Sequence, residues 1–327
     1  MDLGQMKYPR PENVTETDWN AITEFLYDLE LKGSSPETIR SYKSNLRTIT
    51  KHLNKSQLSI ITQDPETLLQ ILSYLRQKTW RGKPLGMKTI ENYFHALSSF
   101  NEYHLFYGKI SGNLVPSFTK RYLKQYKKNG NGAKRKLISV EEMALLINST
   151  IPVVEKAIIT VFAKTGVRRG ELISMDVEDI DWHHGRIKLK PKNKRSNLDV
   201  YFDQETALIL QRWLRVRDGY VVDGEKALFI GDKGCRIGRN IVYKMVVGNA
   251  ARVGLHDSVS DRLEDHFSPH CGRHWFTTHL RRAGMPREFI QELRGDSRRD
   301  AIDIYDHIDH DELRRAYLEA IPRLGIA

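Results

Sequence analysis

Residues 152–172 read PVVEKAIITVFAKTGVRRGEL, and this stretch decides how the second half of the chain folds. Residues 152–164 are a mostly apolar segment long enough for a buried helix. Gly166 ends that helix, because glycine readily adopts the left-handed conformation found just past helix C-termini. Arg168 and Arg169 follow at once, so two permanent positive charges stand where the chain leaves the helix. Taken alone, such arginines are ordinary surface residues.

The sequence on either side of this stretch predicts a mainly helical domain with one small antiparallel sheet. Ser139 and Glu142 form a capping box at the start of a helix. Residues 185–190 and 198–202 alternate like a short hairpin, with residues 191–197 as its turn. The helical period continues through residues 203–217, 237–253, 268–283, 286–294 and 309–320.

The first 123 residues predict a separate, all-helical domain. Apolar residues recur at helical spacing in four segments, which begin near Thr15, Ser35, Asp64 and Met87. Residues 124–136 (KQYKKNGNGAKRK) are basic, contain two glycines and lack apolar periodicity, so they predict a linker. We therefore expect a mainly α protein: a helical domain over 1–123, a basic linker over 124–136, and a second domain over 137–327.

Length and composition exclude several classes of protein. The 327 residues suit two domains, and 40% hydrophobic with 28% charged residues is the composition of a globular chain. No segment approaches the roughly 20 apolar residues of a membrane span, and the N-terminus has no signal-peptide core. Two cysteines, Cys235 and Cys271, cannot build a disulfide framework. We expect an intracellular protein of the cytoplasm with no membrane contact.

The net charge of +11 points to a polyanionic partner. Residues 1–140 hold 22 Lys and Arg against 12 Asp and Glu, whereas residues 141–327 hold 30 against 29. The excess therefore lies in the first domain and linker, as in a clamp that neutralises phosphates without reading much sequence. A solubilising basic surface is the alternative interpretation. The residues we expect to contact DNA are Arg81, Lys83, Lys88, Lys134, Arg135 and Lys136.

Few motifs indicate chemistry directly. The sequence has no phosphate-binding loop, no dinucleotide fingerprint and no HExxH, so we expect neither a cofactor nor a metal. Residues 268–274 (SPHCGRH) place a cap and a proline before His270 and Arg273, on one side of a helix's first turn. Lys192 lies in the hairpin turn, and Tyr305 lies among charged neighbours near the C-terminus. Each has an ordinary structural interpretation by itself.

Together these residues resemble the tyrosine recombinases, which include phage-type integrases and Xer recombinases. The likeness runs from about residue 15 to 320 and comprises five motif residues in order: Arg168, Lys192, His270, Arg273 and Tyr305. Arg168 lies in a Thr-Gly-x-Arg-x-x-Glu-Leu segment, and His270 and Arg273 form a His-x-x-Arg box. Lys190 and Lys194 compete with Lys192 for the position of the hairpin lysine.

The resemblance implies a site-specific recombinase that cuts and rejoins duplex DNA through a 3′-phosphotyrosyl intermediate. Arg168 and Arg273 would stabilise the charged phosphate, since guanidinium groups are permanently charged planar donors. A phenol has a pKa of about 10 and must lose its proton as it attacks, so His270 would act as general base for Tyr305. Lys192 would protonate the departing 5′-oxygen. The ester keeps the bond energy, so rejoining needs neither ATP nor metal.

One position departs from the family pattern. Where the family has Leu-Gly-His, or a tryptophan, before the tyrosine, this chain has Arg294-Gly295-Asp296. An ionised carboxylate only accepts hydrogen bonds and repels a phosphate unless it is paired with an arginine. Asp296 therefore either supports a neighbouring arginine or leaves this sixth position to another donor. The replacement is more similar to integrases of archaeal viruses and plasmids than to bacterial Xer enzymes, which favours a mobile element.

Two other functions compete with this interpretation. A type IB-like topoisomerase would share the nucleophile but relax supercoils as a monomer. A catalytically silent DNA-binding protein would keep the clamp, and Asp296 is the one feature that supports it. The resemblance also implies a homo-oligomer, a tetramer on paired DNA sites, joined by the C-terminal tail. The apolar face of that tail, near residues 313–321, could equally cover its own domain.

The charge distribution makes a prediction about salt. Removal of the first 123 residues should reduce the slope of log affinity for duplex DNA against log salt concentration, because fewer counterions are then released. Fluorescence anisotropy over a salt series, with the full chain as reference, measures this slope. An unchanged slope would show that the basic excess does not contact DNA.

Overall fold

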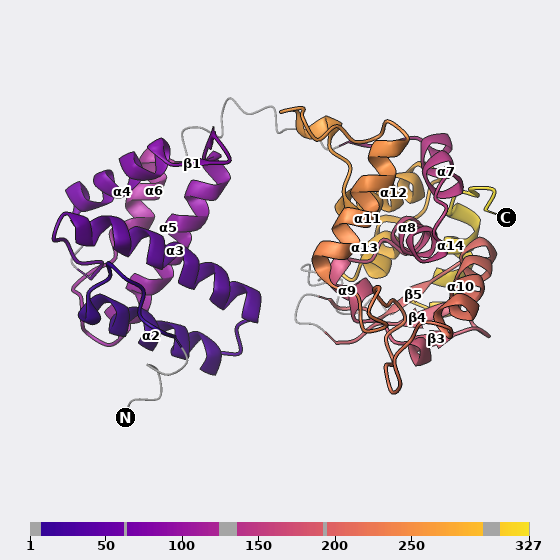
Figure 1. The fold of residues 1–327 in the computed structure, drawn as a ribbon, viewed down its shortest axis with the longest axis horizontal. Coiled ribbons are helices and arrows are strands. Elements are labelled where there is room, and N and C mark those ends of the chain that lie inside the picture. Colours follow the sequence, from indigo (N-terminus) through magenta and orange to yellow (C-terminus); the bar gives the residue numbers. More distant parts are fainter. Residues whose placement is uncertain (1–7, 62–63, 124–135, 192–194, 297–307, 327) are drawn as a thin grey trace. The chain divides into compact units, whose positions relative to one another are not determined.

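The computed structural model describes residues 8–61, 64–123, 136–191, 195–296 and 308–326. The chain divides into two compact units, Met1–Gly130 and Asn131–Ala327, each with its own hydrophobic core (Figure 1). The division falls inside the segment that the sequence predicts as a basic linker. The protein is mainly helical with small antiparallel sheets, as predicted. None of the described helices is both long and apolar enough to cross a membrane.

The first unit is a helical bundle with one short hairpin, so the prediction of an all-helical domain was wrong in this detail: strands of two residues are too short to show an alternating pattern. Its elements are α2 (Glu16–Leu31), α3 (Pro36–Lys55), α4 (Pro65–Gln77), β1 (Thr79–Trp80), β2 (Lys83–Pro84), α5 (Met87–Phe106) and α6 (Val115–Tyr122). Thr15, Ser35 and Asp64 cap the first three helices through their side chains, at the predicted starts. The sequence analysis missed α6, because its eight residues bury only Val115 and Phe118, too few for a visible period.

Apolar stripes of these helices form the core of the first unit. Phe25 of α2 packs edge-on against Phe100 of α5, with ring centroids 5.8 Å apart. The rings of Phe94 and Phe118 stack at 5.3 Å and fasten α6 to α5. Most charged residues of this unit lie on its surface; Asp18 is buried, and its carboxylate accepts a hydrogen bond from Asn54 Nδ2 at 2.6 Å.

The hairpin of β1 and β2 carries two of the predicted DNA contacts. Arg81 and Gly82 both have positive φ, 53° and 77°, as a two-residue type I′ turn requires. Arg81 and Lys83 are exposed on this hairpin. Lys88, in the first turn of α5, is also exposed and pairs with Glu91 at 3.0 Å.

The second unit combines helices with a three-stranded antiparallel sheet in the order β3-β4-β5. Its elements are α7 (Val140–Asn148), α8 (Val153–Thr165), α9 (Arg169–Ile173), β3 (Ile180–Asp181), β4 (Arg186–Lys188), β5 (Asp199–Tyr201), α10 (Gln204–Arg217), α11 (Arg239–Arg252), α12 (Pro269–Arg282), α13 (Arg287–Arg294) and α14 (His310–Ala320), with 3₁₀ turns at Val177–Asp179 and Leu263–Asp265. The predicted hairpin is β4–β5; the two-residue β3 is too short to show an alternating pattern.

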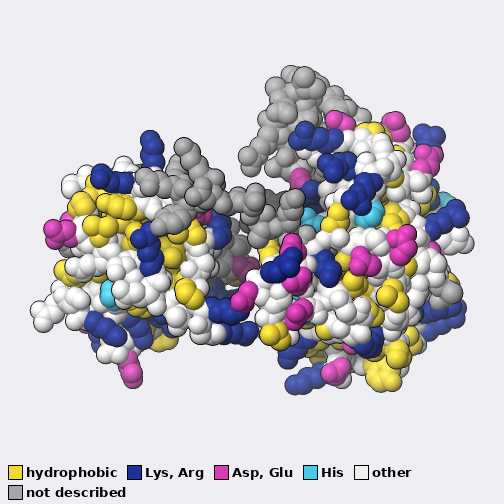
Figure 2. Space-filling model, turned by 90° about the horizontal axis from the view of Figure 1, so that it is seen from above, with side chains coloured by type: hydrophobic (Ala, Val, Ile, Leu, Met, Phe, Trp, Pro, Cys, Tyr) yellow, Lys and Arg dark blue, Asp and Glu magenta, His cyan; other side chains and the backbone are white. Residues whose placement is uncertain are grey.

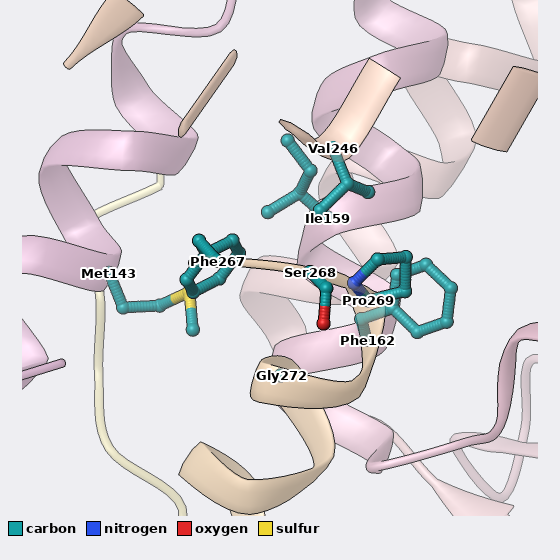
Figure 3. A pocket seen from close by; sticks show the side chains of 8 residues that line it. All are labelled: Met143, Ile159, Phe162, Val246, Phe267, Ser268, Pro269 and Gly272. Atoms are coloured by element: carbon teal, nitrogen blue, oxygen red, sulfur yellow. The ribbon is translucent and has the colours of Figure 1, made fainter. Parts of the chain in front are cut away.

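Helix α8 lies at the centre of this unit, packed against α10 and α12. Every residue from Ala157 to Thr165 is buried. The predicted capping box of Ser139 and Glu142 is present and starts α7. Side chains from α7, α8, α11 and the start of α12 line a small pocket (Figure 3). Its volume is only about 10 Å³, room for one water molecule at most.

The C-terminal tail packs on its own unit. Leu313, Tyr317 and Ile321 are buried in a cluster with residues of α12 and α13. Beneath them the wholly buried Lys164 pairs with Asp203 at 2.6 Å and Glu205 at 2.5 Å. Its ammonium also donates to the Pro322 carbonyl at 2.7 Å. Of the two interpretations of the apolar tail face, this arrangement favours the cover of its own domain.

Acidic and basic side chains are mixed on the visible face of the molecule (Figure 2). Figure 2 shows, on one face of the molecule, Lys and Arg side chains spread over both units, with Asp and Glu interspersed among them. The second unit therefore offers no uniformly basic face in this view. Any anion that it binds must be held by a few focused arginines, as its near-balanced sequence charge predicts.

Lys164→Ala should destabilise the second unit by about 3–5 kcal/mol, because two largely buried carboxylates lose their cation. Burial raises the pKa of Glu205, but Lys164 and the Leu324 N–H outweigh it and lower that pKa below its ordinary value. The stabilisation is therefore present above pH 4.5 and is lost as the pH falls through the lowered value, so acid sensitivity should weaken in the variant.

Urea unfolding at pH 7 and at a series of decreasing pH values below 4.5 measures both effects. Lys226→Ala is the matched control, because the ion pair of Lys226 with Glu178 is exposed and its loss should change stability by less than about 1 kcal/mol. Equal losses for the two variants would contradict a structural role for the buried lysine.

Candidate active site

Arg168 owes its position to the left-handed end of α8. Gly166 has φ +61°, and a Cβ there would lie 2.4 Å from Cδ1 of Phe276 in α12. Only glycine therefore permits this reversal of the chain directly against α12. Arg168 follows as the first residue before α9, with its backbone extended. The turn brings the guanidinium of Arg168 beside the start of α12.

The start of α12 supplies the second arginine and a histidine. Pro269 occupies the first helical turn, and Gly272 allows α12 to lie against Phe162 of α8, where an added Cβ would be 3.1 Å from the phenylalanine Cβ. His270 is exposed, whereas Arg273 is buried. The two residues line one pocket, although their side chains differ in exposure.

That pocket has a volume of about 360 Å³ and is strongly basic. It is lined by Val167, Arg168, Arg169, Gly170, Arg239, Tyr243, Ser268, Pro269, His270 and Arg273. Burial and the neighbouring Arg239 lower the pKa of Arg169 below its ordinary value. A pocket with four arginines and a histidine fits a phosphate of a nucleic-acid backbone.

Arg273 is held by hydrogen bonds rather than by solvent. It donates to the carbonyl of Gly166 at 2.8 Å and of Arg294 at 2.9 Å, and to Asp296 Oδ1 at 3.0 Å. Burial and the nearby Arg168 and Arg294 lower the pKa of Arg273 to about 10. The guanidinium nevertheless keeps its charge at neutral pH, so it is a fixed cation in the pocket.

The buried ion pair of Glu171 and Arg195 holds Arg168 in position. Glu171 Oε1 accepts from Arg168 Nη1 at 2.9 Å, and Oε2 accepts from the backbone N–H of Arg168 at 2.7 Å. Arg195 Nη1 also donates to Glu171, at 3.2 Å, and to the Arg294 carbonyl at 3.0 Å. Burial lowers the pKa of Arg195, which Glu171 partly offsets.

Asp296 lies between the two predicted catalytic arginines. Its Oδ1 accepts from Arg168 Nη2 at 3.1 Å and from Arg273 Nη2 at 3.0 Å. Its Oδ2 lies 3.0 Å from Arg294 Nε. Of the two alternatives left open by the sequence, this geometry favours support of neighbouring arginines.

The structure thus brings four of the predicted site residues together: Arg168, His270, Arg273 and Asp296. Lys192, Tyr305, Lys134 and Arg135 lie outside the described residues. Lys136 is half-buried at the start of the second unit. Lys190, which competes with Lys192 for the hairpin position, pairs with Asp176 at 3.0 Å and Asp179 at 2.7 Å. Those carboxylates raise its pKa, which makes it a poor proton donor.

Sequence analysis missed Arg195, Arg239 and Tyr243. Arg195 follows Lys192 and Lys194 in a predicted turn, where exposure is the normal expectation, yet its side chain is 1% exposed. Arg239 and Tyr243 lie one turn apart at the start of α11, and that spacing was the only signal for a shared face.

Curated proteins with similar sequences are recombinases. Tyrosine recombinase XerC of Vibrio cholerae is 29% identical over 299 residues, which cover 89% of this chain and 89% of the relative. Tyrosine recombinase XerC of Psychromonas ingrahamii is 27% identical over 298 residues, covering 89% and 92%.

Solved structures share the fold. A lambda integrase dimer bound to a COC′ core site has a TM-score of 0.63 at 15% identity, covering 89% of this chain and 98% of that one. The Tn1549 transposon integrase in complex with circular intermediate DNA has a TM-score of 0.61 at 18% identity, covering 90% and 98%. XerH recombinase bound to difH substrate scores 0.59 at 20% identity, covering 95% and 91%.

The fold and the arginine pocket define a class of enzyme that cuts and rejoins DNA, the tyrosine recombinases. Residues 137–312 match the phage integrase family, and residues 22–103 match the N-terminal SAM-like domain of phage integrases. The chain belongs to the phage integrase family. It is a site-specific DNA recombinase.

Gly295→Ala should disturb this site through Arg195. Gly295 has φ +60°, and a Cβ there would lie 2.2 Å from Arg195 Cγ. We expect a loss of about 2–5 kcal/mol, the sum of left-handed strain and overpacking. Gly254→Ala is the control, because Gly254 has φ +73° but nothing within 4 Å. It should cost only about 1–2 kcal/mol. Urea unfolding compares the two, and equal losses would contradict the close packing.

Proposed function

We propose that this recombinase cleaves duplex DNA by attack of the Tyr305 phenol on a backbone phosphate held by Arg168 and Arg273. One observation carries the proposal: both arginines, from different elements, direct an Nη2 atom to the same oxygen, with His270 in the same pocket. Two guanidinium groups aimed at one anionic oxygen suit the charge that accumulates on a phosphate under attack.

The rest of the chemistry follows from the residue types. The phenolic oxygen bonds to phosphorus while the bond from phosphorus to the 5′-oxygen breaks. His270 accepts the phenol proton, and Lys192 gives a proton to the leaving oxygen. The products are a 3′-phosphotyrosyl ester and a free 5′-hydroxyl. Attack by a 5′-hydroxyl of a second strand reverses the step with every bond balanced, so strand exchange needs no cofactor and no metal.

The remaining parts hold the DNA. We assign the first unit to the core-binding role, with Arg81, Lys83 and Lys88 against backbone phosphates. Lys134, Arg135 and Lys136 of the basic linker would extend that contact. Because strand exchange requires two cleaved duplexes, we assign a tetramer on paired sites in the cytoplasm. The preference for a mobile element rests on the Arg-Gly-Asp segment at 294–296.

A covalent trap tests the nucleophile. Duplexes carrying candidate sites taken from the DNA beside the gene, nicked near the expected cut, should give a covalent protein–DNA adduct with the wild type. Tyr305→Phe should give none, because it lacks the phenolic oxygen, while binding the same duplexes. An adduct with Tyr305→Phe would contradict the proposal. Binding without any wild-type adduct would support the catalytically silent alternative, and relaxation of supercoils without strand exchange would support the topoisomerase.

A modified leaving group tests the role of Lys192. Lys192→Ala should cut ordinary DNA at least about 100-fold more slowly, the usual worth of a general acid. The cleavage rate of Lys192→Ala should recover on DNA in which sulfur replaces the bridging 5′-oxygen, because a thiolate leaves without being protonated. Lys190→Ala is the matched control, since Lys190 is engaged by Asp176 and Asp179, and the sulfur should not rescue it selectively. Failure of the sulfur to rescue Lys192→Ala would remove the general-acid role.

A further inference from the structure

The carboxylate of Asp296 lies where two guanidinium groups converge. Arg168 Nη2 and Arg273 Nη2 both donate to Oδ1, at 3.1 and 3.0 Å. An arginine N–H that donates to this oxygen cannot donate along the same direction to a phosphate oxygen. The carboxylate and an incoming phosphate therefore compete for the same two donors.

Two carboxylates, those of Glu171 and Asp296, lie near these arginines, and they differ in how easily an anion from solvent can displace them. The side chain of Glu171 is 4% exposed and that of Arg195, its second partner, is 1% exposed. Their pair is enclosed and fixed. In contrast, the side chains of Arg168 and Asp296 are 36% and 33% exposed, so an anion from solvent can reach the Arg168–Asp296 contact.

The backbone of Asp296 is held independently of its carboxylate. Its N–H donates to the Gln291 carbonyl at 3.1 Å, at the end of α13. Its own carbonyl accepts from Ser196 Oγ at 3.2 Å. Of its side-chain contacts, Oδ2 lies at an ion-pair distance of 3.0 Å from Arg294 Nε. The carboxylate can therefore rotate away from Arg168 and Arg273 toward Arg294 while the fold stays in place.

The net charge of the arginine cluster favours the replacement of the Asp296 carboxylate by a phosphate. The cluster holds four cations and two carboxylates, which leaves two positive charges: Arg168, Arg195, Arg273 and Arg294 against Glu171 and Asp296. A carboxylate that stays between the arginines cancels one charge that a phosphate needs. Once it moves aside, both Nη2 atoms are available to the phosphate.

We propose that Arg168 and Arg273 form an anion subsite that Asp296 fills in the DNA-free chain, so that a backbone phosphate binds there by displacing this carboxylate. The identity of the anion as the scissile phosphate rests on the proposed function. The subsite itself rests on the contacts of Asp296. Asp296 is thus an internal competitor of the substrate at a position where the family has a hydrogen-bond donor.

Inorganic phosphate tests the subsite on the full chain without any recombination site. Its affinity is measured from the rise of the thermal unfolding midpoint at constant ionic strength, balanced with sodium chloride. Asp296→Asn keeps the size of the side chain and removes its charge, and should bind phosphate at least about 10-fold more tightly than the wild type. Asp232→Asn, an equal change of charge at an exposed residue, should match the wild type.

A double variant locates the bound phosphate. Adding Arg168→Ala to Asp296→Asn should abolish the gain, because one of the two donors is then missing. Equal phosphate affinity in wild type and Asp296→Asn would overturn the proposal, as would a gain that survives the loss of Arg168. Asp296→Ser removes the same charge and serves as second variant if Asp296→Asn does not fold.

DNA separates this proposal from the proposed function. On a duplex containing the recombination site, Asp296→Asn should bind more tightly when the scissile phosphate is charged and should lose that gain when a neutral methylphosphonate replaces it. An equal gain on both duplexes would overturn the competition. Phosphate binding as expected, without any wild-type adduct, would instead refute the cleavage mechanism and leave the subsite intact.

Discussion

The shared, buried carboxylate of Glu171 is the contact on which the site depends. It accepts hydrogen bonds from the side chain and backbone of Arg168 and from Arg195. Arg195 in turn donates to carbonyls at the end of α13. Because a buried charge that loses its partner is very costly, no member of this chain of contacts can move alone. The arginines are therefore positioned before DNA arrives, which is the condition for electrostatic stabilisation of a transition state.

Close helix packing places this network at the surface of the second unit. Gly166 and Gly272 let α12 lie against α8, where any larger residue would collide with Phe276 or press on Phe162. The buried α8 acts as a fixed support, so the start of α12 and the turn after α8 keep a constant separation. The same glycines therefore serve both core packing and the site: they allow α8 and α12 to pack closely, and this packing positions Arg168 and Arg273.

Asp296 shows how tertiary contacts change the meaning of a residue. As a residue type it is unsuited to a phosphate site, because an ionised carboxylate repels the substrate. In the structure it is surrounded by three arginines and becomes their counter-ion. The acidic residue therefore leaves the cluster cationic, and the family's activity is compatible with its presence beside the phosphate-binding arginines.

Local signals determined most of the helices and the chemistry. Caps, periodicity and the glycine after α8 predicted the helix starts and the turn at Arg168, since these depend on neighbours within four residues. The order of Arg, His-x-x-Arg and Tyr identified the class. Tertiary structure alone decided that Arg195 is buried: Lys190 and Arg195 stand in similar stretches of sequence, but Arg195 bonds to carbonyls nearly 100 positions away. Burial of that kind depends on contacts between distant segments, which no local pattern encodes.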